Sequence, residues 1–359
     1  MTFDELLRAP QYSLPQAEKE QVLTGHLADL TEHHRSRCAE YDRLVRVLEP
    51  GYRRAQRLSE VPYLPVSLFK SHALRSVPEA AIFKTLQSSG TTGQQPSRIV
   101  LDRETAQRQT LALSRIMTEV LGPKRLPMLI VESPSLIEDR RQFNARVAGL
   151  LGMMNFGRDH VYALDGRMEL DVDSVRSFLD RFGKAPFLMF GFTWVVWQYF
   201  LLRLAGEKVD LSNGVLIHSG GWKKLEEQAV SARELRRRFL AETGLQRIYN
   251  FYGMVEQVGS VYLEGEDGYF YPPNFADVIV RHPITWQELP PGEAGVLQVL
   301  SLLPLSYPGH SLLTEDLGVI HAIDAGTCGR LGKAFSVLGR LPRAELRGCS
   351  DVIATRAGA

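Results

Sequence analysis

A short segment rich in glycine and hydroxyl side chains carries the strongest chemical signal in the sequence. It reads Ser88, Ser89, Gly90, Thr91, Thr92 and Gly93. Two glycines allow a sharp turn that exposes backbone N–H groups, four hydroxyls add hydrogen-bond donors, and Arg98 follows nearby. The composition indicates a cradle for phosphate groups, with a plain surface loop as the alternative. It is not a Walker A loop, because the glycines are too close together and no Lys-Ser/Thr pair follows.

Three cysteines, Cys38, Cys328 and Cys349, supply the possible nucleophiles. Their odd number and the lack of a CxxC spacing argue against a disulfide framework and a cysteine zinc site, which favours a reducing, cytoplasmic location. Cys349 is ten residues from the end of the sequence. Arg347 would favour its thiolate and Asp351 would disfavour it, so a reactive and a structural cysteine both stay open. Cys328 is a rival nucleophile, and Cys38 is expected to pack in a helical region.

Composition excludes several classes of protein. The chain has 359 residues, 44% of them hydrophobic, with 42 Lys and Arg against 41 Asp and Glu. A net charge of +1 offers no field to gather nucleic acid, so that partner is not expected. The first residues carry Asp4 and Glu5 and lack an apolar run, so they do not indicate a signal peptide.

Alternating short apolar runs and longer amphipathic segments must position these groups. Strands are expected at 98–101, 128–133, 187–190, 215–218 and 247–253. Helices are expected at about 104–120 and 139–151, and a further charged helix ends at 244. Antiparallel strands are expected after 258. This alternation predicts an α/β fold with layered mixed sheets. The expected regions are a helical N-terminal region (1–60), a large domain (61–338) and a minimal C-terminal tail (339–359). In the helical region, His33 and His34 are expected to be solvated.

Residues 185–206 are long and apolar enough to be mistaken for a membrane span. Pro186, Gly191, Gln198 and Arg203 interrupt the run, which therefore predicts a buried strand that turns at Gly191 into a helix from about Thr193.

The glycine-rich segment, SSGTTGQQPS, resembles the phosphate-binding loop of the adenylate-forming superfamily of acyl and aryl ligases. Four further matches follow in the order that the superfamily has them. The adenine-side turn is matched by Ser219, Gly220 and Gly221, and the aromatic-Gly-x-x-Glu segment by Tyr252, Gly253 and Glu256. The Thr-Gly-Asp motif is matched by Thr314, Glu315 and Asp316, and the hinge by Gly339 and Arg340. Within the superfamily the chain is similar to LuxE-type acyl-protein synthetases, on VPYLPVSLFK, RQFNARVAGL, FGRDHVYAL, FGFTWVVW, NFYGMVEQVGS and RGCSD.

The resemblance implies a reaction and a set of roles. ATP and a carboxylic acid, with a fatty acid favoured, would give an acyl-adenylate, and Cys349 would take the acyl group for an acyl-CoA-reductase-like partner. Thr91 and Thr92 would contact phosphate oxygens, Glu256 would hold Mg²⁺, Tyr252 would pack on adenine and Asp316 would hold the ribose. Asp316 has the weakest context, because Glu315 replaces the usual glycine.

The resemblance also implies a lysine-bearing domain beyond the hinge, which this sequence is expected to lack because it stops at Ala359. Candidate substitutes for the lysine are Arg98, Lys223, Lys224 and Arg340. Phe192, Trp194 and Trp197 are expected to line the acyl pocket, with core packing as the alternative, and His218 is either a pocket residue or a core histidine.

Two other functions stay open from sequence. One is an adenylating ligase that delivers acyl or aryl groups to coenzyme A or a carrier protein, with a structural Cys349. The other is an inactive binding subunit of a reductase complex.

Overall fold

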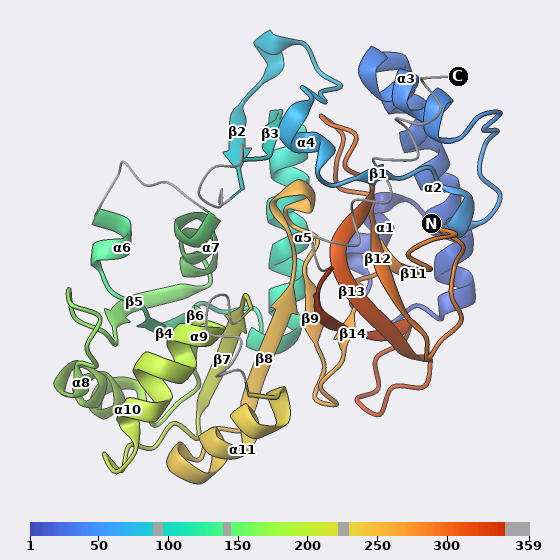
Figure 1. The fold of residues 1–359 in the computed structure, drawn as a ribbon. Coiled ribbons are helices and arrows are strands. Elements are labelled where there is room, and N and C mark those ends of the chain that lie inside the picture. Colours follow the sequence, from blue (N-terminus) through green and yellow to red (C-terminus); the bar gives the residue numbers. More distant parts are fainter. Residues whose placement is uncertain (89–95, 139–144, 222–229, 342–359) are drawn as a thin grey trace. The chain divides into compact units, whose positions relative to one another are not determined.

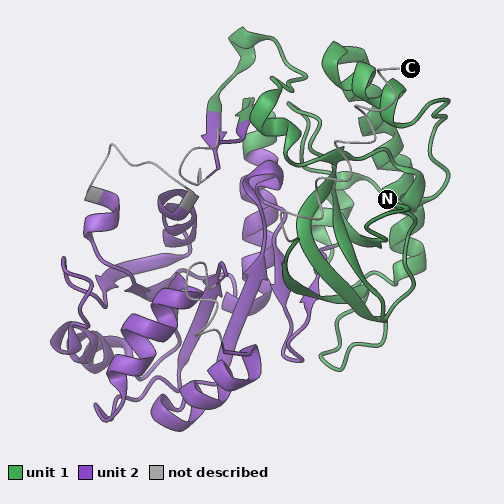
Figure 2. Cartoon of the chain, in the orientation of Figure 1, with its two compact units in different colours: residues 1–84, 99–106, 274–359 green, residues 85–98, 107–273 purple. Residues whose placement is uncertain are grey.

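A computed structural model describes residues 1–88, 96–138, 145–221 and 230–341 (Figure 1). The chain forms two compact units, each assembled from separated segments (Figure 2). Unit 1 contains residues 1–84, 99–106 and 274–359, and unit 2 contains 85–98 and 107–273. The regions 1–60, 61–338 and 339–359 do not correspond one to one with these units and stay a prediction.

Unit 2 is built on a mixed sheet with the strand order β10-β9-β8-β7-β6-β4-β5. Neighbouring strands from β8 to β5 are parallel, and β9 and β10 continue the sheet antiparallel. The strands are β4 (Leu126–Val131), β5 (Gly157–Tyr162), β6 (Phe187–Phe192), β7 (Gly214–Ser219), β8 (Arg247–Tyr252), β9 (Tyr262–Glu264) and β10 (Phe270–Tyr271).

Helices follow these strands in the order expected of α/β layering. They are α5 (Arg103–Leu121), α6 (Ser135–Glu138), α7 (Ala145–Met154), α8 (Val172–Phe182), α9 (Thr193–Val195), α10 (Leu202–Leu204) and α11 (Ala232–Thr243), with a π-helical segment at Val196–Leu201 and a 3₁₀ turn at Val255–Gln257. Side chains of α8 to α11 pack with β4, β6 and β7 in one apolar core. The central strands β6 and β7 are almost entirely buried, and they are apolar up to His218 and Ser219 at the end of β7, as expected of parallel strands covered on both faces.

The strand and helix expected across residues 185–206 are confirmed. β6 ends at Phe192 and helix begins at Thr193, and Gly191 is required there because an added Cβ would lie 2.7 Å from Val196 and 2.9 Å from Val131. Within the described ranges, no helix combines the length and apolarity that crossing a bilayer demands.

Unit 1 contains an antiparallel sheet in the order β11-β12-β13-β14, with β1 parallel to β13. The strands are β1 (Leu64–Pro65), β11 (Ala276–Arg281), β12 (Ala294–Ser301), β13 (Ser311–Ile323) and β14 (Lys333–Arg340). Its helices are α1 (Phe3–Arg8), α2 (Gln16–Arg37), α3 (Ala39–Leu48) and α4 (Leu68–Ser71), with 3₁₀ turns at Leu58–Glu60 and Glu79–Ala81. Helices α1 to α3 lie within residues 1–60, and the division of the chain at residue 60 stays a prediction.

The expectation for His34 is wrong, because its side chain is fully buried. Its Nε2 donates to the Pro304 carbonyl (3.2 Å), and its Nδ1 accepts from the Ser76 hydroxyl (2.8 Å). The ring stacks on His310 with centroids 4.9 Å apart. Amphipathic spacing on α2 could not reveal this, because the partners come from segments far away in sequence.

A second buried polar cluster links α2 to the sheet of unit 1. The Lys333 ammonium lies 3.4 Å from Asp277 and donates to the Val278 carbonyl at 3.0 Å, and Gln16 donates to Asp277 at 2.7 Å. Burial lowers the pKa of the neighbouring Lys19 to about 8, in spite of the attraction of Asp277.

Candidate functional site

The base of the glycine-rich segment is a hairpin between β2 (Lys84–Gln87) and β3 (Arg98–Leu101). The Ser88 N–H donates to the Ser97 carbonyl at 3.1 Å, and the Ser97 N–H donates to the Ser88 hydroxyl at 2.9 Å. These two serines therefore fix the points where the segment leaves and rejoins the hairpin. Ser89, Gly90, Thr91, Thr92 and Gly93 lie outside the described residues.

A row of residues marks the carboxyl ends of the parallel strands in unit 2. The register pairs Val131 with Gly191 and Phe192 with Ser219, so Glu132, directly after β4, follows on beside Phe192. Ser219 in turn pairs with Phe251. Such ends are where α/β folds place ligands, most often where the strand order reverses. Here it reverses at β4, which lies between β5 and β6.

Gly220 makes the turn that leaves β7. Its φ is +85°, a left-handed conformation that side chains disfavour, and an added Cβ would lie 3.8 Å from the Phe192 ring. Gly221 is exposed, and among the described residues no atom lies within 4 Å of a Cβ added to it. The predicted adenine-side turn is therefore a real backbone turn beside a predicted acyl-pocket residue.

Tyr252 is the last residue of β8 and lies against two other rings. Its centroid is 5.9 Å from that of Tyr262 and 6.4 Å from that of Phe270. The side chain is half-buried, and Gly253 follows it without crowding. The adenine contact stays a prediction, but a supported aromatic ring stands at the end of a parallel strand.

Glu256 lies in the 3₁₀ turn that follows, and only 7% of it is exposed. In the described parts of the chain, no three His, Cys, Asp or Glu side chains gather into a metal cluster. Mg²⁺ usually takes one or two carboxylates and completes its shell with phosphate oxygens and water. A single buried carboxylate therefore fits Mg²⁺ bound to a nucleotide.

His218 and Thr193 form a buried pair at the ends of β7 and β6. The Thr193 hydroxyl lies 3.0 Å from His218 Nδ1. Burial lowers the pKa of His218 to about 3, so this imidazole is neutral at physiological pH. It can offer a hydrogen bond but no positive charge.

The aromatic residues around α9 differ in burial, and all of them contact the apolar core of unit 2. Trp197 is buried in the core with Phe200, so its part in the acyl pocket stays a prediction. Phe192 and Trp194 are half-buried. Sequence reasoning missed their neighbour: the Arg146 guanidinium lies 5.4 Å from the Phe192 centroid and 5.2 Å from that of Trp194.

Asp316 and Arg340 belong to unit 1, where β13 and β14 pair them directly. The Arg340 Nε lies 3.7 Å from an Asp316 oxygen, and the Arg340 side chain is 77% exposed. The Thr314 hydroxyl donates to the Leu297 carbonyl (2.8 Å) and accepts from the Asp316 N–H (3.1 Å). This bonding fixes the backbone that presents the carboxylate, but it does not test the ribose contact.

Two of the three cysteines lie within the described residues. Cys38 is buried between α2 and α3, as expected. Cys328 is a partly buried free thiol in the loop between β13 and β14. Cys349 lies outside the described residues, as do Lys223 and Lys224.

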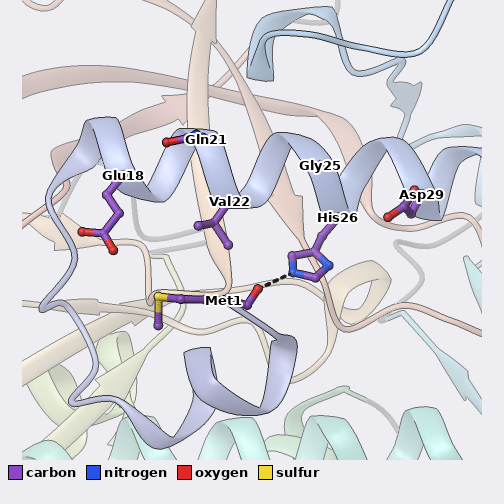
Figure 3. Close-up of a pocket in the computed structure, with 7 residues that line it drawn as sticks. All are labelled: Met1, Glu18, Gln21, Val22, Gly25, His26 and Asp29. Carbon is purple, nitrogen blue, oxygen red and sulfur yellow. Dashed lines mark hydrogen bonds between the residues drawn. The ribbon is translucent and has the colours of Figure 1, made fainter.

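One pocket of about 510 Å³ lies elsewhere, along α2 in unit 1 (Figure 3). Within it, His26 Nε2 lies 2.8 Å from the Met1 carbonyl. It is lined by Met1, Glu18, Gln21, Val22, Gly25, His26 and Asp29, and none of the predicted site residues is among them.

Comparison with known proteins decides the family. The family model described as acyl-protein synthetase, LuxE, matches residues 2–357. The chain belongs to the LuxE acyl-protein synthetase family. This member is therefore a ligase. A curated relative, the long-chain-fatty-acid–luciferin-component ligase of Vibrio harveyi, is 22% identical over 353 residues, covering 95% of this chain and 89% of the relative.

Solved structures confirm the fold of this LuxE-family ligase. An open conformation of 2-hydroxyisobutyryl-CoA ligase, complexed with its acyl-AMP and CoA, has a TM-score of 0.68 at 18% identity, over 91% of this chain and 76% of that one. The thioesterification state of the same ligase gives a TM-score of 0.69 at 19% identity, over 92% and 70% of the two chains. The predicted α/β fold of an adenylate-forming ligase is confirmed.

Proposed function

We propose that this LuxE-family ligase activates a carboxylic acid, with a fatty acid favoured, as an acyl-adenylate and then loads the acyl group onto Cys349. The observation that carries the proposal is the set of residues at the carboxyl ends of the parallel strands in unit 2. The Gly220 turn, the Phe192 ring and the Tyr252 ring stand there on adjacent parallel strands, downstream of a hydroxyl-rich segment whose base is fixed by Ser88.

In the first step, a carboxylate oxygen of the acid attacks the α-phosphorus of ATP, and the bond to pyrophosphate breaks. Thr91, Thr92 and neighbouring backbone N–H groups would hold phosphate oxygens, and Tyr252 would pack on the adenine. Mg²⁺, held by Glu256, would offset phosphate charge. Neutral His218 adds no charge beside the acid, whose carboxylate must stay free to attack.

In the second step, the Cys349 thiolate attacks the acyl carbon, forming a thioester and releasing AMP. Asp316 would hold the ribose in both steps, and Arg340 would be the hinge cation that assists the first step, adenylation. A reductase of the acyl-CoA-reductase type would then receive the acyl group, since an acyl thioester is a substrate suited to hydride reduction.

Labelling with a radioactive fatty acid and ATP tests both steps. The wild-type chain should retain hydroxylamine-sensitive label, and Cys349→Ser should lose it while keeping acid-dependent ATP–pyrophosphate exchange. Cys328→Ser and Cys38→Ser are the matched controls and should label normally. Full labelling of Cys349→Ser would disprove self-acylation at that residue. Free acyl-CoA made by this variant would instead identify coenzyme A as the acceptor.

Glu256→Gln tests the magnesium contact. The substitution keeps the size of the side chain but removes its charge, so the Mg²⁺ concentration for half-maximal exchange should rise at least about tenfold. Glu242→Gln, at an exposed carboxylate of the same unit, is the comparison and should leave the Mg²⁺ dependence unchanged. An unchanged Mg²⁺ dependence in Glu256→Gln would contradict the assignment.

A further inference from the structure

Glu132 and Arg146 form an ion pair beside the proposed acid site. The Arg146 Nε donates to a Glu132 oxygen at 2.9 Å, and Nη2 donates to the same oxygen. The Glu132 side chain is 2% exposed and that of Arg146 24%. The other Glu132 oxygen accepts from the Ser133 N–H at 2.9 Å. The Glu132 carboxylate is thus held by the Ser133 N–H at one oxygen and by Arg146 at the other, and it fixes the position of the Arg146 guanidinium.

The pair holds the guanidinium over two aromatic rings. Arg146 lies within 5.4 Å of both the Phe192 and the Trp194 centroids, close enough for cation–π attraction to each. Glycines flank the Phe192 ring: an added Cβ would lie 3.7 Å from it at Gly149 and 3.8 Å at Gly220. The ring is therefore oriented by a charge and bordered by two residues without side chains, so a larger side chain at either glycine would press against it.

Stability alone does not explain an ion pair in this place. Burying two charges costs desolvation free energy, and apolar residues of similar volume often serve a fold as well or better. The pair also stands where the strand order reverses at β4, the position at which α/β folds bind ligands.

We propose that Arg146, held by Glu132, is a positioning residue that decides which acids this site accepts. It fixes Phe192 and Trp194 as one wall of the acid pocket. Because Glu132 already neutralises the guanidinium and is itself buried, the wall suits the uncharged chain of a monocarboxylic acid. It disfavours an acid with a second carboxylate. The inference rests on the proposed function for the location of the acid.

Acid binding without ATP tests the proposal directly. Calorimetry would measure acetate, octanoate, tetradecanoate, benzoate and octanedioate with wild type, Arg146→Gln, Arg146→Lys and Glu132→Gln. Arg176→Gln is the matched control, because Arg176 pairs with Glu207 at 2.8 Å on the exposed surface of the same unit.

The wild-type chain should bind octanoate more tightly than octanedioate. Arg146→Gln should weaken binding of the preferred acid about tenfold, because the Phe192 and Trp194 rings lose the two cation–π contacts that hold them in position. Arg146→Lys should recover part of that loss, because it keeps the charge without the fork that pairs with Glu132. Arg176→Gln should bind like wild type, and the KM for ATP should not change in any of these variants.

Gly149→Val covers the case in which Arg146→Gln fails to fold. It fills the space beside Phe192 and should reduce binding of tetradecanoate and benzoate more than binding of acetate. Unchanged affinities across the panel in the folded Arg146 or Gly149 variants would overturn the proposal, as would equal binding of octanoate and octanedioate by wild type.

Pyrophosphate exchange separates this proposal from the proposed function. Acid binding that depends on Arg146 without any exchange would disprove adenylation and support the positioning role. Exchange with an acid preference that Arg146→Gln leaves unchanged would support adenylation and disprove the positioning role.

Discussion

At the carboxyl ends of the strands in unit 2, the effect of a substitution depends on the backbone conformation and burial of the single residue. Gly220 adopts a φ of +85°, whereas the adjacent Gly221 has no positive φ, and a Cβ added to it would meet no atom of the described residues within 4 Å. Glu256 and His218 are buried, so their chemistry is set by their surroundings more than by their residue type. Substitutions at this scale should therefore have effects that differ sharply between neighbours.

Gly220→Ala should lower the free energy of unfolding by about 1–2 kcal/mol, because a Cβ disfavours the left-handed conformation. The added methyl does not clash, since its nearest neighbour, Phe192, would lie 3.8 Å away. Urea unfolding monitored by circular dichroism would measure the change. Gly221→Ala is the control and should have the stability of wild type. Equal stability of both variants would show that the turn is free to rearrange.

Secondary-structure elements of unit 1 are joined by buried polar clusters. The histidine cluster connects α2 with the segment before β13, and the Lys333–Asp277 cluster connects α2 and β14 with β11. These clusters favour one arrangement of the packed elements, because the buried groups make their hydrogen bonds only in that arrangement. They should respond to pH and to charge removal far more than surface pairs do.

Acid should destabilise unit 1 through His34 and His310. Burial holds the pKa of His34 well below its usual value and, for His310, lowers it to about 3, and the mutual repulsion of the histidines adds to the shift of His34. The unfolded chain binds these protons below about pH 6.5 and the folded chain does not. Stability should therefore be intact above pH 6.5 and fall below it by about 1.4 kcal/mol per pH unit for each histidine.

Urea unfolding between pH 7.5 and 4.5 would measure this slope. His310→Gln should reduce the slope, whereas His282→Gln, at a partly buried histidine outside this cluster, should keep it. A wild-type slope no steeper than that of His310→Gln would contradict the assignment.

Asp277→Asn should destabilise the chain by about 3–5 kcal/mol, because it removes the buried counter-charge of Lys333 and leaves only the more exposed Glu20, 3.5 Å from the ammonium. The Lys333 side chain is only 3% exposed and its ammonium lies 3.4 Å from Asp277. Thermal and urea unfolding would measure the loss. Asp29→Asn, which breaks the exposed 2.7 Å pair with Arg54, is the control and should change stability little. Similar losses in both variants would mean that burial does not decide the effect.

For the whole molecule, membership of the LuxE family and the ligase fold agree with the order of motifs along the chain. A nucleotide that binds only the folded chain must stabilise it by mass action. With ATP and Mg²⁺ at about 100 times the dissociation constant, the stabilisation should be about 2.7 kcal/mol. A thermal-shift assay would detect it, with Mg²⁺ alone as the control. No shift at any ATP concentration would contradict nucleotide binding.

The sequence alone determined the order of elements, the strand and turn before Thr193, and the motifs that resemble an adenylate-forming ligase. Local periodicity and turn residues carry this information, because they act between neighbours in the chain. The same patterns predicted the helix at about 104–120, which the structure places at Arg103–Leu121.

Only the tertiary structure decided which distant groups meet. It buried His34 against Pro304 and Ser76, although its position in a charged helical segment predicted a solvated residue. It also placed Arg146 between Glu132 and the Phe192 ring, a contact that no sequence spacing announces. Periodicity tells which face of an element is apolar, but the partner of a buried charge is set by packing between segments that are far apart in sequence.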